Sequence, residues 1–164
     1  MTIKDQLTAI KTGLKAWQTQ YTAQVHIAHD VPHLFRILGG NPGVPRAGIL
    51  FAGETTRNEL LSDVIGRVDR KFWVAISRGY DLEAWKGKSL IEGVAGGAPM
   101  FDLLSDARDT LRALVFTDGF EPNPFYKGIE LLTFEGVTMD AYRIEIEVAG
   151  DIADNNNATG DPPQ

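Results

Sequence analysis

The segment from Pro99 to Val148 constrains the fold of this chain more than any other part of it. Apolar residues recur there first at helical spacing and then at every second position. The helical set comprises Met100, Leu103, Leu104, Ala107, Leu111 and Leu114, and the alternating set comprises Tyr142, Ile144, Ile146 and Val148. The first pattern is typical of a helix with one buried stripe, and the second of an antiparallel strand with one face on a core. We therefore expect a helix from Pro99 to about Phe116, and a final strand over 137–148 whose charged residues face outward.

A similar stripe near the N-terminus predicts a second amphipathic helix. Its apolar positions follow one another at helical steps: Ile3, Leu7, Ile10, Leu14 and Trp17. Thr2 is expected to cap the backbone amide of Asp5 while the Asp5 carboxylate reaches back toward Thr2, as in a capping box. We expect this stripe to pack on the core.

Strand-forming residues separated by Gly- and Pro-rich segments predict a sheet. Besides the final strand, we expect strands over residues 23–28, 48–54, 67–78 and 128–134. Residues 55–65 fit either a short helix or the start of a strand. Connecting segments are expected over 39–45 and 79–98, with a tight turn at Glu135 and Gly136.

Together these elements predict an α+β fold. An antiparallel or mixed sheet of about four to five strands packs against two amphipathic helices. We expect a single domain over residues 1–149, and a flexible, acidic, Asn- and Pro-rich tail over 150–164.

Composition excludes several classes of protein. No apolar run approaches the ~20 residues that a membrane-spanning helix needs, so we expect no membrane association. The first 21 residues carry charges throughout, unlike a signal peptide, and we expect the protein to stay where it is made. The chain has no cysteine, which excludes disulfides, thiolate metal sites and cysteine nucleophiles.

The charge balance argues against a nucleic-acid partner. The formal net charge is −6, and residues 118–154 contain nine acidic and two basic residues. Tight binding to a phosphate backbone needs clustered Lys and Arg, so we expect no specific binding to DNA.

The three histidines are the candidate residues for metal chemistry. His26, His29 and His33 lie close in sequence, with Asp30 between them. Imidazoles and a carboxylate can bind zinc, but this spacing is not that of a helical metal motif, and Pro32 argues against one regular element carrying all of them. We interpret them as surface or loop histidines, with a metal site as the alternative. Phosphate-binding Gly-Lys-Ser/Thr and nucleophilic Gly-x-Ser-x-Gly motifs do not occur, so we do not expect an enzyme.

The order of the expected elements, with a long strand at 67–78 and a closing strand at 141–148, resembles the tail terminator proteins of long-tailed bacteriophages over residues 2–149. The resemblance implies an α+β subunit without catalytic residues or cofactors. It also implies a homohexameric ring that caps the tail tube protein, stops tube polymerisation and forms the head–tail joining surface for a head connector or completion protein. DNA would pass through the lumen without specific binding. Such a protein belongs to the virion tail and, during assembly, to the host cytoplasm.

Three alternatives stay open beside this resemblance. Other phage minor tail and head–tail connector proteins share its features, and a small metal-binding enzyme could use the histidine cluster. The third alternative is a ligand-binding or adaptor domain of ordinary α+β form.

Contacts with neighbouring subunits or partners are expected where the chain is exposed. The regions concerned are the loop at 39–45, the connection at 81–97 and the outward face of the last strand. We interpret the charged run at 67–71 as a solvated face, with ion pairs between subunits as the alternative. The candidate contact residues are Asn41, Arg67, Arg70, Trp85, Lys88, Arg143, Glu145 and Glu147.

Overall fold

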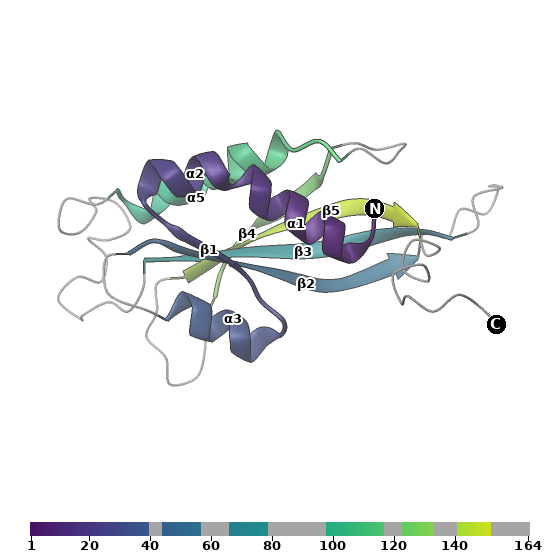
Figure 1. Ribbon diagram of the computed structural model, residues 1–164, viewed down its shortest axis with the longest axis horizontal. Helices are drawn as coiled ribbons and strands as arrows, with labels where there is room; N and C mark the ends of the chain where they lie inside the picture. Colours follow the sequence, from purple (N-terminus) through teal and green to yellow (C-terminus); the bar gives the residue numbers. More distant parts are fainter. Residues whose placement is uncertain (40–43, 57–65, 79–97, 117–122, 133–140, 152–164) are drawn as a thin grey trace.

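The computed structural model describes residues 1–39, 44–56, 66–78, 98–116, 123–132 and 141–151. Its centre is a five-stranded sheet of order β1-β2-β3-β5-β4 (Figure 1). β1 pairs with β2 in parallel, and the other neighbours are antiparallel. The strands are β1 (Gln24–Ile27), β2 (Arg46–Thr56), β3 (Arg67–Ser77), β4 (Phe125–Leu131) and β5 (Ala141–Asp151). The predicted α+β fold with a mixed sheet is therefore confirmed.

Helices cover both faces of this sheet. In Figure 1, one face of the sheet is covered by α1 (Ile3–Gly13), α2 (Lys15–Tyr21) and α5 (Met100–Arg112). The main core lies between these helices and the sheet, and both predicted stripes contribute to it. The alternation in β5 also holds, because its apolar residues face this core: Ile144, Ile146 and Val148.

The N-terminal helix is interrupted rather than continuous. α1 ends at Gly13, and Leu14 has a ψ of 1°, so α2 begins as a new segment. The predicted capping box is present, with the Asp5 amide 3.1 Å from the Thr2 hydroxyl and the Thr2 amide 2.9 Å from the Asp5 carboxylate. Trp17 is buried, and its indole Nε1 donates to the carbonyl of Leu103 at 3.0 Å. That bond connects α2 to α5.

The other face of the sheet carries α3 (Val31–Leu38), a helix that the sequence reading did not predict. Asp30 is its N-cap and accepts from the His33 amide at 2.7 Å. Pro32 lies in the first turn, where a missing amide leaves no helical bond unmade. The helix buries a second, smaller core with β2, β3 and β5, which contains Ala28, Leu34, Ile37, Leu38, Leu50, Ala75 and Ala141.

Several predicted boundaries shift. α5 ends at Arg112, four residues before the predicted end, and Pro99 is its N-cap. β4 begins three residues before the predicted start, and β5 continues through Gly150 to Asp151, two residues beyond the predicted end of the domain. Thr55 and Thr56 belong to β2.

Other predictions lie outside the described residues. They concern most of the ambiguous segment at 55–65, the connection at 79–97, the turn at Glu135 and Gly136, and residues 152–164. Within the described part, no helix is long and apolar enough to cross a membrane.

Candidate functional site

Paired charged side chains surround Trp73 on the sheet face that also carries α3. We call this group the charged face, and it consists of Lys71, Trp73, Lys127, Glu130, Arg143, Glu145 and Glu147. The Arg143 guanidinium lies 4.1 Å from the centre of the Trp73 ring, and the Trp73 Nε1 donates to Glu145 at 2.9 Å. Lys127 pairs with Glu147 at 3.3 Å, and Arg143 also pairs with Glu130.

The charged face contains three predicted contact residues and brings them together. Arg143, Glu145 and Glu147 alternate on β5, so their side chains share one face of the sheet. All three are half-buried: Arg143 and Glu145 contact Trp73, and Glu147 pairs with Lys127. They form an ordered, charge-balanced surface rather than independent solvated charges.

The predicted exposure of Arg70 is wrong. We expected it on a solvated face and among the contact residues, but its side chain is fully buried on the core side of β3. Its Nη1 donates to the carbonyl of Met1 at 2.7 Å and to the Gln6 amide oxygen at 3.1 Å, and its Nη2 donates to the carbonyl of Asp151 at 2.8 Å. Glu54 lies 3.5 Å from its Nε. Buried in this way, Arg70 has no surface to offer a partner.

The remaining predicted contact residues are dispersed. Arg67 is half-buried at the start of β3, opposite Asp151 in the sheet register. Asn41, Trp85 and Lys88 lie outside the described residues.

The three histidines occupy three different environments. His26 is exposed on β1, His29 precedes α3, and His33 lies in the first turn of that helix. The rings of His29 and His33 stack with centres 4.9 Å apart, and the His33 Nδ1 accepts from the His29 amide at 3.2 Å. No group of three or more potential ligands close enough to hold a metal ion occurs among the described residues.

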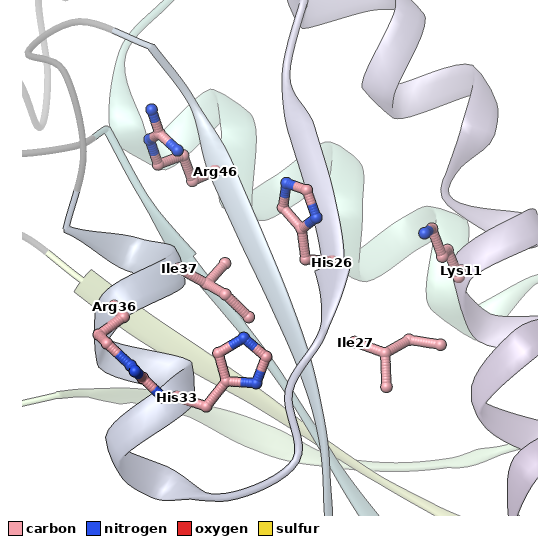
Figure 2. A pocket seen from close by; sticks show the side chains of 7 residues that line it. All are labelled: Lys11, His26, Ile27, His33, Arg36, Ile37 and Arg46. Atoms are coloured by element: carbon pink, nitrogen blue, oxygen red, sulfur yellow. The ribbon is translucent and has the colours of Figure 1, made fainter.

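Two of these histidines line a basic groove that the sequence reading missed (Figure 2). The groove has a volume of about 650 Å³ and follows β1, with α1 on one side and α3 on the other. Its lining consists of Lys11, His26, Ile27, His33, Arg36, Ile37 and Arg46. These residues come from four separate elements, so no local motif could have revealed them.

A titratable contact joins two of the helices. The Tyr21 hydroxyl on α2 donates to the Asp106 carboxylate on α5. Burial, together with that bond and the nearby acidic charges, raises the pKa of Tyr21 to about 12. The phenol therefore stays neutral, which suits a structural contact between helices.

In comparisons with known proteins, no protein-family model and no curated protein matches this chain.

Proposed function

We propose that this protein is a structural subunit of a long-tailed bacteriophage that closes as a ring on the end of the tail tube. In this role it stops tube polymerisation and offers a joining surface to the head connector. The sequence resemblance supports this proposal, and the mixed sheet packed against helices is the kind of subunit that the resemblance implies.

The observation that carries the proposal is the apolar edge of the sheet at β4. Phe125 is 66% exposed and Leu131 is 54% exposed, and β4 is the terminal strand on this side among the strands that the structure describes. Large apolar side chains on a sheet edge favour association with another chain. A contact that uses different patches on two copies closes into a ring when its rotation permits, so this edge fits one half of such a contact.

The charged face adjoins the same edge and fits the task of selecting the partner. Glu147 lies opposite Phe125 in the register of β4 and β5, so paired charges flank the exposed Phe125 side chain. Charge pairs beside an apolar patch contribute more to specificity and register than to affinity. The acidic net charge fits a lumen through which DNA passes without being bound.

Assembly of the purified protein tests this proposal. We expect mass measurement in solution and negative-stain electron microscopy to show rings of one discrete size, formed at high concentration or on added tail tubes. A protein that stays monomeric under both conditions, encoded far from any capsid or tail genes, contradicts the proposal.

The same images separate the phage alternatives. Rings at the end of the tail tube support the terminator role, whereas rings only at the head portal support a connector role. No described feature favours the metal-dependent enzyme.

A further inference from the structure

The second free edge of the sheet is β1, on the side opposite β4. The Gln24 amide donates to the carbonyl of Pro45 at 3.0 Å, and the Ala28 amide donates to the carbonyl of Ile49 at 2.8 Å. Backbone groups of successive strand residues point to alternate sides, so those of Val25 and Ile27 point away from β2. No strand within the described residues pairs with this edge. β1 therefore offers backbone donors and acceptors to an additional strand.

The basic groove follows this edge and has positive side chains on both of its sides. Figure 2 shows Lys11 on the same side of β1 as Ile27, and Arg36 and His33 on the side of α3. A strand added to β1 would direct alternate side chains toward these two sides. Each side also has an apolar residue beside its cation, Ile27 on one and Ile37 on the other.

The lining is positive in a chain that is negative overall. It combines three cationic side chains with two imidazoles, and it includes no carboxylate. Arg46 is held by the bond from its Nη1 to the Gln24 amide oxygen at 2.7 Å, while its Nε is buried and has no acceptor among the described residues. The bond to Gln24 positions the guanidinium beside β1.

We propose that the basic groove binds an extended acidic segment of a partner protein, which adds to β1 as a further strand. Carboxylates of the segment pair with Lys11 on one side and with Arg36 and Arg46 on the other. Its apolar side chains contact Ile27 and Ile37, and its backbone bonds to that of Val25 and Ile27. This is recognition by strand addition, in which backbone bonds give affinity and side chains give specificity.

A peptide fits this groove better than a nucleic acid does. The free edge of β1 supplies backbone groups in strand geometry, which a phosphate backbone cannot use. The net charge of −6 also repels a long polyanion, whereas a short acidic segment interacts only with the local positive lining. This inference does not rest on the proposed function, because it concerns the edge of the sheet opposite β4.

A binding experiment with a defined peptide tests the proposal. The probe is fluorescein-labelled Val-Glu-Val-Val-Glu-Val, whose acidic residues fall on opposite sides of a strand, measured by fluorescence polarisation against the full chain. We expect saturable binding that weakens with added salt, and no binding of the same peptide with Lys in place of Glu. N-methylation of every second residue blocks the backbone N–H groups on one side of the peptide strand. Binding should be abolished when the blocked groups face β1 and tolerated when they face away from it.

Matched variants locate the site. Arg36→Glu reverses a charge in the groove and should weaken binding about tenfold. Arg112→Glu is the control, since both arginines are exposed and lie in the last turn of a helix, but Arg112 does not line the groove. Circular dichroism melting checks that both variants fold.

Four outcomes overturn the proposal. These are equal affinity of both variants for the peptide, equal tolerance of the two N-methylated peptides, and tighter binding of a single-stranded DNA oligonucleotide of the same charge. The fourth is a change in the mass of the protein in solution with Arg36→Glu while peptide affinity stays the same, because the groove would then hold a second copy.

Discussion

At the scale of single residues, Arg70 shows how a charge becomes part of a core. A buried guanidinium is costly unless its donors are satisfied, and here three oxygens accept from its two Nη atoms while Glu54 lies beside its Nε. Gly150 makes room for it, because a Cβ at that position would lie 2.6 Å from the Arg70 Cζ. The burial could have been predicted: Phe72 and Val74 alternate toward the core, and the same alternation places Arg70 on the core side.

Replacing Arg70 should therefore destabilise the fold strongly. Arg70→Met removes the hydrogen bonds that the guanidinium donates to the carbonyls of Met1 and Asp151, and we expect a loss of about 3 kcal/mol in the free energy of unfolding. Urea denaturation followed by tryptophan fluorescence measures it. Arg112→Met, at an exposed position, is the control and should change stability by less than about 0.5 kcal/mol. Equal stabilities for the two variants would show that the buried cluster contributes nothing.

Tyr21 gives a pH-dependent prediction. Its pKa in the folded protein is about 12, above the ordinary value of 10.0, so the folded state holds the proton more tightly than the unfolded state. The contribution to stability is complete below pH 10 and is lost as the pH rises toward about 12. Urea midpoints of the wild type and Tyr21→Phe should converge over this range. Parallel curves for the two proteins would mean that Asp106 does not hold the phenol.

At the scale of elements, the packing of α3 was harder to predict than the helices of the main core. The long helices follow from stripes of several turns, whereas α3 has two turns and its second residue, Pro32, also fits a loop. Its position depends on Gly48, where a Cβ would lie 2.3 Å from the Leu34 Cδ1. Such a contact between β2 and α3 is not visible from either segment alone. For the same reason the basic groove, assembled from four elements, could not be derived from the sequence.

Gly48→Ala should test this close approach. The added methyl group overlaps the buried Leu34 side chain, so we expect a loss of about 2 kcal/mol in the free energy of unfolding. In the double variant Gly48→Ala with Leu34→Ala, the smaller side chain at position 34 leaves space for the added methyl group. The loss of stability in the double variant should therefore be smaller than the sum of the losses in the two single variants. Strict additivity in a double-mutant cycle measured with urea would show that the helix accommodates the methyl group by moving.

At the scale of the whole molecule, the two sheet edges lie on opposite sides and differ in chemistry. The β4 edge is apolar and flanked by the charged face, while the β1 edge is basic. The sequence allowed the outward charges of β5 to be predicted, because strict alternation fixes the face of each residue. It did not show that β4 lies at an edge, since strand order depends on pairing between distant segments.

Changing the β4 edge should affect assembly more than folding. Phe125→Glu together with Leu131→Glu places like charges on an edge that we propose to be covered in the ring, and rings should disappear from electron micrographs. Monomer stability should change by less than about 0.5 kcal/mol for each exposed site. Val115→Glu is the control, because Val115 is 65% exposed but lies outside β4. Rings that persist in the double variant would place the subunit contact elsewhere.

The hydrogen bonds of Arg70 also have a practical consequence for following this protein in solution. One side chain holds the backbone of both Met1 and Asp151, so the first residue and the end of β5 meet at one corner of the fold. The chain has no cysteine, and a single one introduced just after Asp151 would be a unique labelling site. An acceptor dye on that thiol and a donor dye on the N-terminal amine would transfer energy efficiently when the protein is folded. Separation of the two dyes would then report unfolding directly, independently of any assembly.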